Sequence, residues 1–105
     1  MSQQEIKKIA EAIRRHIPDA KILLFGSRAR GDNLTTSDID LIVISKTFQN
    51  THFTRRAAHI LKILHQEHAL PRTDIDILCY TPQELHKKKN EIGTIQHALK
   101  HAKEI

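Results

Sequence analysis

Two aspartates and a glycine–serine pair lie close together in the first half of the sequence. The segment GSRARGDNLTTSDID begins with Gly26 and Ser27 and ends with Asp38 and Asp40, which are separated by one isoleucine. Two carboxylates held together near a core repel each other unless a cation neutralises them. Oxygen ligands without a cysteine or a paired histidine favour Mg²⁺ or Mn²⁺ over zinc. We therefore expect Asp38 and Asp40 to bind a divalent metal ion.

The glycine–serine pair has the composition of an anion site. Gly26 and Ser27 follow an apolar run, where a strand is expected to end and a short helix to begin, so backbone N–H groups can face an anion. Arg28 and Arg30 add positive charge. A phosphate site beside a divalent metal suits a nucleoside triphosphate carried on Mg²⁺. The P-loop pattern GxxxxGK[ST] is absent, and apolar Ile39 between the acids excludes an EF-hand loop.

Hydrophobic periodicity predicts the elements that must position these residues. Apolar residues recur at helical spacing in three segments and form short apolar or alternating runs in three others. In chain order we predict a helix from Gln3 to Ile17, a strand at residues 20–26 buried on both faces, and a strand from Ser37 to Ile44. A helix from about Thr51 to Ala69 follows, whose apolar stripe is Phe53, Ala57, Ile60, Leu61 and Leu64. After it come a strand from Thr73 to Tyr80 and a last helix, whose apolar stripe is Leu85, Ile92, Ile95, Leu99 and Ala102. Thr81, Pro82 and Glu84 supply the N-cap, first position and capping box of that last helix. This order predicts an α/β fold around a small sheet, in a single domain spanning residues 1–105.

The proposed chemistry requires a particular strand arrangement. Gly26 ends its strand whereas Asp40 lies near the start of the next one, so the two sites meet only if these strands are antiparallel. Asp74 and Asp76 share one face at the start of the third predicted strand. They reach the same end of the sheet if that strand is parallel to the second, with the intervening helix as a right-handed crossover. Asp74 or Asp76 would then add the third carboxylate of a two-metal phosphoryl-transfer site.

Composition indicates a cytoplasmic globular protein. Apolar residues make up 39 % and charged residues 28 % of the chain, and no segment approaches the ~18 consecutive apolar residues of a membrane span. The N-terminal segment lacks the continuous apolar region of a signal peptide. The single cysteine, Cys79, lies among apolar strand residues and is predicted to be part of the core.

The net charge of +5 would suit a polyanionic partner such as RNA. The basic residues are scattered over predicted helices, however, so we favour solvated helix faces over a nucleic-acid site. They lie at Arg14-Arg15, Arg55-Arg56 and Lys87 to Lys89. Histidine pairs at His65 and His68 and at His97 and His101 have no evident third ligand, which favours structural or solvated roles.

The sequence resembles the minimal nucleotidyltransferases of the DNA polymerase beta superfamily. The motif of that family is Gly-Ser, ten residues, then Asp-x-Asp, and this chain has Gly26-Ser27, ten residues, then Asp38-Ile39-Asp40. The segment DILCYTPQEL resembles the strand that carries the third aspartate of the family and the helix after it. Counting back from Thr81-Pro82 selects Asp76 over Asp74. The resemblance implies a small mixed-sheet fold like the polymerase beta palm, with flanking helices.

The resemblance also implies the roles of the site residues and the partners. It assigns Asp38, Asp40 and Asp76 to catalysis as ligands of two Mg²⁺ ions, or Mn²⁺, and Gly26 and Ser27 to the phosphates of ATP or another nucleoside triphosphate, with Arg28 or Arg30 as a helper. In the minimal family the acceptor is commonly a tyrosine of a helical HEPN RNase toxin, and the nucleotidyltransferase is the antitoxin that adds AMP to it. This implies a hetero-oligomer. Members often continue into a short C-terminal strand, whereas this chain ends at Ile105, so we expect the base-proximal part of the site to be incomplete or built differently.

Two other interpretations remain open. The aspartates could be strand-edge acids that cap turns. Alternatively, the fold could be kept without activity, as a non-catalytic antitoxin that acts by complex formation or as an RNA-binding module.

Overall fold

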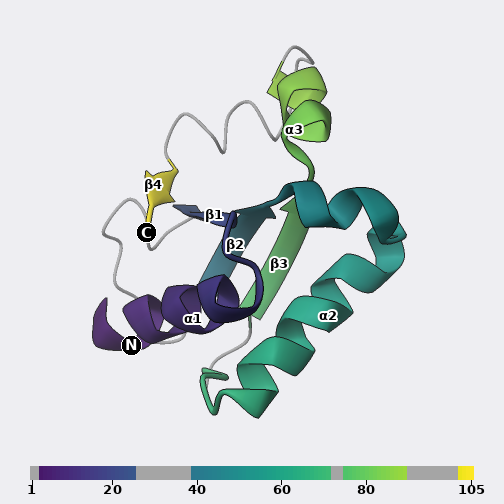
Figure 1. The fold of residues 1–105 in the computed structure, drawn as a ribbon. Helices are drawn as coiled ribbons and strands as arrows, with labels where there is room; N and C mark the ends of the chain where they lie inside the picture. The colour runs from purple at the N-terminus through teal and green to yellow at the C-terminus, as the bar shows by residue number, and fades with distance from the viewer. Residues whose placement is uncertain (1–2, 26–38, 72–74, 90–101) are drawn as a thin grey trace.

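The structure is a computed structural model that describes residues 3–25, 39–71, 75–89 and 102–105 (Figure 1). Apart from a short 3-10 helix and a last strand, the described elements follow the predicted order of helix, strand, strand, helix, strand and helix. The elements are α1 (Gln3–His16), β1 (Lys21–Phe25), β2 (Ile39–Ile44), the 3-10 helix η1 (Lys46–Asn50), α2 (Phe53–Gln66), β3 (Ile75–Tyr80), α3 (Pro82–Lys89) and β4 (Lys103–Glu104).

The four strands form one mixed sheet in the order β3-β2-β1-β4. β1 and β2 are antiparallel, and the last residue of β1, Phe25, pairs with Asp40 near the start of β2. β2 and β3 are parallel and are connected through α2. Both strand directions that the predicted site requires are therefore confirmed. The predicted α/β fold, a small mixed sheet with flanking helices, is confirmed as well.

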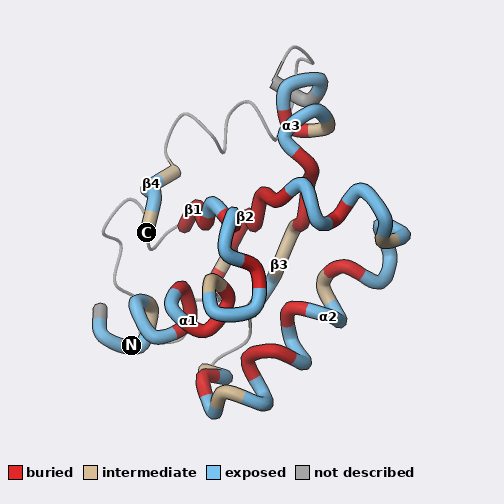
Figure 2. The backbone as a smooth tube through the Cα atoms, in the orientation of Figure 1, coloured by how far each residue is buried: buried red, intermediate tan, exposed pale blue. Residues whose placement is uncertain are grey.

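One face of the sheet carries the main core, which α1 and α2 cover (Figures 1 and 2). Alternate residues of β2, such as Ile39 and Leu41, point to this face and are fully buried. From the helices, Ile13 and Ile60 pack against them. Complete burial of each such side chain contributes roughly 1.5–3 kcal/mol, so this face dominates the stability of the fold.

The opposite face carries a smaller apolar cluster near α3. Leu23, Ile42, Ile44 and Tyr80 come from the sheet and Leu85 from α3. β1 therefore contributes buried residues to both faces, as predicted for the apolar run at residues 20–26. Because α3 meets this face at the ends of β2 and β3, the beginnings of those strands lie away from α3 (Figure 1).

The C-terminal residues differ from the prediction. Ala102 precedes a strand instead of belonging to a helix, and β4 pairs with β1 in antiparallel register. The backbone N–H of Ile105 donates to the carbonyl of Ile22 at 3.0 Å, and the Arg14 guanidinium donates to the Ile105 carbonyl. The expectation that this chain lacks the short C-terminal strand is wrong. Two exposed polar residues have no readable strand pattern, and β4 forms because β1 offers an edge with free backbone groups.

Helix α2 buries a different stripe from the one predicted. Ile60 and Leu64 are buried as expected and Ile63 joins them, whereas Phe53 is 50 % and Leu61 38 % exposed. The helix turns its Ile60–Ile63–Leu64 line to the sheet, so residues at its margins remain in solvent. The positions of Ile92, Ile95 and Leu99 of the predicted last helix lie outside the described residues.

Burial makes Cys79 unreactive. The side chain is in the main core, as predicted, and desolvation raises the pKa of its thiol to about 12 although the positive charge of Arg56 opposes this. We expect the folded protein to react with a thiol reagent at pH 8 at least about 100-fold more slowly than the protein unfolded in urea, because only the thiolate attacks. Equal labelling rates with and without urea would contradict the burial of Cys79.

Candidate functional site

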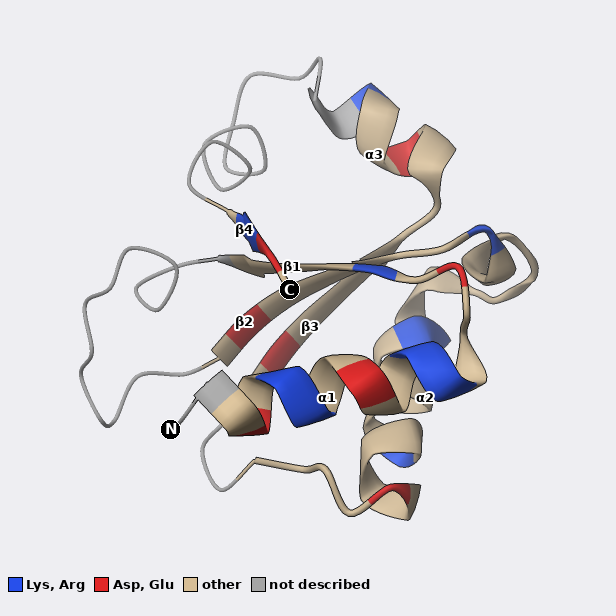
Figure 3. Ribbon diagram, turned by 60° about the vertical axis from the view of Figure 1, so that its left-hand side comes forward, with Lys and Arg blue, Asp and Glu red and all other residues tan. Residues whose placement is uncertain are grey.

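Two predicted site residues lie side by side at the start of neighbouring strands. Asp40 of β2 and Asp76 of β3 are Cα partners in the parallel register, and Figure 3 shows the acidic segments of the two strands next to each other. Asp40 is half-buried and Asp76 is exposed. Neighbouring strands are about 4.8 Å apart, so carboxylates from both can reach one cation. The pair therefore fits a divalent ion with oxygen ligands.

Packing on the other face of the sheet determines where these carboxylates point. The residues that precede them, Ile39 and Ile75, also pair with each other and belong to or pack against the main core. Because side chains alternate along a strand, burying these isoleucines forces Asp40 and Asp76 to the opposite face. A slip of one residue would bury a carboxylate and expose an isoleucine, so the core fixes the register of the pair.

The other predicted site residues lie outside the described residues. These are Gly26, Ser27, Arg28, Arg30, Asp38 and the alternative third carboxylate Asp74. The pairing of Phe25 with Asp40 nevertheless shows that β1 ends and β2 begins at the end of the sheet that carries the two carboxylates. No group of three possible metal-binding side chains occurs within the described ranges, which do not include Asp38. The assignment of metal and phosphate ligands stays a prediction.

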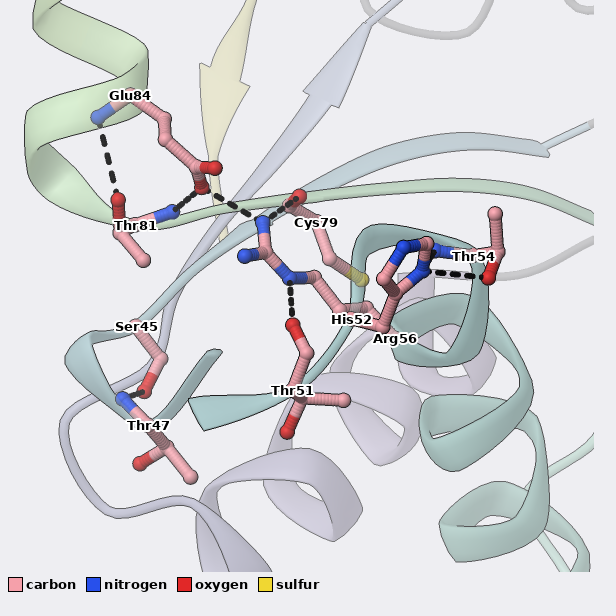
Figure 4. Close-up of polar contacts among 9 residues, drawn as sticks. All are labelled: Ser45, Thr47, Thr51, His52, Thr54, Arg56, Cys79, Thr81 and Glu84. Carbon is pink, nitrogen blue, oxygen red and sulfur yellow. Dashed lines mark hydrogen bonds and ion pairs between the residues drawn. The ribbon is translucent and has the colours of Figure 1, made fainter. Parts of the chain in front are cut away.

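Arg56 connects α2, β3 and α3 from a buried position (Figure 4). Its guanidinium donates to the carbonyls of Thr51 at 3.0 Å and Cys79 at 3.3 Å, and to Glu84 Oε1 at 2.6 Å. The side chain is 7 % exposed, so the prediction that it lies on a solvated helix face is wrong. Three acceptors from separate segments of the chain replace the water that a buried guanidinium loses. Arg56 thus sets where α3 begins relative to the sheet.

The capping box predicted at the start of α3 is confirmed. The Thr81 N–H donates to Glu84 Oε1 at 2.8 Å, and the Glu84 N–H donates to Thr81 Oγ1 at 3.2 Å. Glu84 Oε1 also accepts from Arg56, so one carboxylate both caps the helix and neutralises the buried guanidinium. The cap was readable from four consecutive residues, but the partner 28 positions away in the sequence was not.

Stability should depend on the ionisation of Glu84. Hydrogen bonds from Arg56, and then from the Thr81 backbone, hold the pKa of this carboxyl below its ordinary value of 4.5. A lowered folded-state pKa adds stability that is fully present above about pH 4.5 and is lost as the pH falls through the folded pKa. Urea unfolding is measured at pH 6 and at pH 3. We expect the free energy of unfolding to fall less between these two pH values in Glu84→Gln than in the unchanged protein. Equal losses would contradict the role of Glu84.

A pocket of about 460 Å³ lies on the face that carries Asp40, at the other end of the sheet. Its described lining comes from β1 and the turn before it, from the end of β2 and the two residues that follow, and from the first two turns of α3. The lining residues are Asp19, Lys21, Leu23, Ile44, Ser45, Lys46, Pro82, Leu85 and His86. Ile44 is four residues from Asp40, so the pocket is about 13 Å from the carboxylate pair along β2. No sequence pattern predicts this pocket, because its walls come from three separate segments.

The described residues form an α/β domain with a mixed sheet, helices over one face, and two aspartates level with each other at the start of parallel strands. The sequence matches the family model described as "Nucleotidyltransferase domain" over residues 6–70, which run from α1 to just beyond α2 and include the segment from Gly26 to Asp40. The chain belongs to this nucleotidyltransferase family.

Solved structures support the assignment of the fold. A protein described as a proposed nucleotidyltransferase from Sulfolobus solfataricus is 27 % identical, with a TM-score of 0.60, and the match covers 80 % of this chain and 70 % of that one. A second proposed nucleotidyltransferase, also 27 % identical, has a TM-score of 0.56 and coverage of 80 % and 86 %. The BolA domain of SufE1 from Arabidopsis thaliana, 18 % identical with a TM-score of 0.56 and coverage of 80 % and 98 %, shares the fold alone. Comparison with curated proteins finds no significant match.

None of the described helices combines the length and apolar composition that crossing a bilayer requires.

Proposed function

We propose that this protein transfers a nucleoside monophosphate, in the first instance AMP from ATP, to a hydroxyl group of a partner protein with the aid of Mg²⁺ or Mn²⁺. Nucleotidyl transfer is the general chemistry of the family to which the chain belongs. The observation that carries the proposal is the pairing of Asp40 with Asp76 at one end of the sheet. Two carboxylates at this separation suit a divalent ion that carries a triphosphate.

The proposed reaction is an in-line displacement at the α-phosphorus. The acceptor oxygen forms a bond to that phosphorus, the bond to pyrophosphate breaks, and the acceptor proton passes to solvent or a nearby base. Asp38, Asp40 and Asp76 would hold the divalent ions, which neutralise the charge that develops on the phosphate oxygens and lower the pKa of the acceptor hydroxyl. Gly26 and Ser27, with Arg28 or Arg30, would orient the β- and γ-phosphates. These residues would fix the geometry, which is the main task of a protein in phosphoryl transfer.

We propose that the acceptor is a helical HEPN-type RNase toxin and that this chain is its antitoxin, in a cytoplasmic hetero-oligomer. The support is the resemblance of the Gly26-to-Asp40 segment and the Asp76 strand to the minimal nucleotidyltransferases. Modification would add a bulky anion to the acceptor side chain and block RNA from the nearby RNase site by repulsion and occlusion.

A transfer assay tests this proposal. The purified protein and a HEPN protein encoded beside it are incubated with MgCl₂ and each of the four α-³²P-labelled nucleoside triphosphates in turn. We expect label on the HEPN protein, greatest with ATP and absent after chelation with EDTA. Tight complex formation without label would refute the enzymatic proposal and support a non-catalytic antitoxin. Binding of RNA by the isolated protein, without either result, would support the RNA-binding alternative.

A further inference from the structure

The pocket between α3 and the sheet has walls that are fixed without a ligand. Ser45, which is 1 % exposed, donates its hydroxyl to Asp19 Oδ1 at 2.7 Å and accepts from the Thr47 N–H at 3.0 Å. The second carboxylate oxygen of Asp19 accepts from the Lys46 N–H at 3.0 Å. These bonds join the turn before β1 to the segment after β2. Both segments line the pocket, so little ordering cost remains for an occupant.

The opposite wall is fixed by the network around Arg56. Pro82, Leu85 and His86 belong to the first turns of α3. The capping box starts that helix, and the ion pair of Glu84 with buried Arg56 fixes its start relative to β3. The pocket is therefore a feature of the folded domain, and its volume lies within the range of about 300–1,000 Å³ that is typical of ligand sites.

The lining combines an apolar floor with a positively charged rim. Leu23, Ile44 and Leu85 are each less than 10 % exposed and form the floor. At the rim, Lys21 and Lys46 are exposed cations. Among the described lining residues, His86 is a further basic side chain, and the carboxylate of the one acid, Asp19, already accepts hydrogen bonds through both oxygens. The chemical complement is an apolar side chain flanked by carboxylates.

The same composition argues against nucleic acid. Sites for single-stranded RNA or DNA place aromatic side chains under the bases and often use arginine. The described lining contains no arginine, and its one aromatic ring is the imidazole of His86. An acidic peptide therefore fits the pocket better than RNA or the base of a nucleotide.

We propose that this pocket, defined by Lys21, Lys46 and the apolar floor, anchors an acidic–apolar segment of the acceptor protein. This inference rests on the proposed function, because it takes the acceptor to be a protein. The pocket shares a sheet face with Asp40, about 13 Å away along β2. An anchor bound there must be separated from the modified hydroxyl by at least about four residues of extended chain. Docking would hold the acceptor near the reacting phosphate and raise its effective concentration.

The binding test uses a synthetic peptide and does not depend on catalysis. The probe is a 12-residue peptide with one leucine between two glutamates and a tyrosine five positions away, titrated into ¹⁵N-labelled protein to 1 mM without ATP or metal. We expect shifts of the amide signals of Ser45, Lys46, Leu85 and His86. The binding should weaken at least about 10-fold in Lys21→Glu and Lys46→Glu. Lys62→Glu, an equal charge change on exposed α2, should alter it less than 2-fold.

Each outcome decides the proposal. No shift at the pocket amides up to 1 mM, or equal binding of a peptide whose glutamates are replaced by lysines, would overturn it. Shifts at these amides caused by a single-stranded RNA oligonucleotide of equal charge, but not by the peptide, would assign the pocket to nucleic acid and overturn it as well. Self-association of the protein through the residues that line the pocket would also overturn the proposal.

The transfer assay separates this inference from the proposed function. If Lys21→Glu and Lys46→Glu raise the acceptor KM without lowering kcat, the pocket anchors the acceptor. Undiminished transfer by both variants would overturn the proposal that the pocket anchors the acceptor, and would leave the enzymatic proposal intact. Peptide binding at the pocket with no transfer to any partner would instead refute the enzymatic proposal.

Discussion

Asp40→Asn and Asp76→Asn are each expected to reduce nucleotidyl transfer by about 10³-fold or more while leaving the protein folded. A divalent ion held by these carboxylates would supply several kcal/mol of transition-state stabilisation, and about 4 kcal/mol corresponds to a factor of 10³. An amide keeps the shape of the side chain but loses the charge that attracts the ion. The measurement is the initial rate of label transfer from α-³²P-ATP at saturating Mg²⁺.

A metal-dependent stability measurement accompanies the rate measurement. We expect Mg²⁺ with a non-hydrolysable ATP analogue to raise the melting temperature of the unchanged protein but not of either variant, because a ligand stabilises only the state that binds it. Glu11→Gln, the same kind of change at an exposed position of α1, serves as the matched control and should keep both properties. Full activity in either aspartate variant would contradict the prediction that Asp40 and Asp76 belong to the active site.

Asp74→Asn distinguishes the two candidates for the third carboxylate. Asp76 is the residue that pairs with Asp40, so its loss should cost far more activity than the loss of Asp74. The reverse order of effects would show that the acceptor-activating ion is held by Asp74.

Arg56→Ala is expected to lower the free energy of unfolding by about 3 kcal/mol. Removing one partner of a buried ion pair typically costs about 3–5 kcal/mol, and the partial exposure of Glu84 places this pair at the lower end. The carbonyls of Thr51 and Cys79 also lose their donor. The guanidinium carbon lies 5.8 Å from the Phe48 ring centroid and 5.6 Å from that of Phe53, so packing and cation–π attraction are lost as well.

The neighbouring arginine provides the control for this change. Arg55 is exposed, and Arg55→Ala should change the free energy of unfolding by no more than about 0.5 kcal/mol in the same urea titration. Arg56→Lys should recover only part of the loss, because an ammonium group cannot match the planar geometry of three separate acceptors. Similar effects of the two alanine substitutions would show that the buried network contributes little.

Local pattern alone predicted much of the architecture. The period of two in β2 assigned Ile39 and Asp40 to opposite faces, and the helical spacing in α1 predicted a helix that ends within a residue of the observed end. The capping box of Thr81 and Glu84 was likewise readable, because all its atoms come from one turn of chain. Such features depend on neighbours in the sequence, so the sequence states them directly.

Which chemical groups are available, and on which face of each strand they lie, can be read from the amino-acid order. Which of these groups meet depends on the folded chain: Asp76 pairs with Asp40, Arg56 is buried against Glu84, β4 joins the edge of β1, and three separate segments enclose a pocket. Strand register and helix orientation follow from the packing of the whole core. Residues tens of positions apart share that packing, and no local period records it.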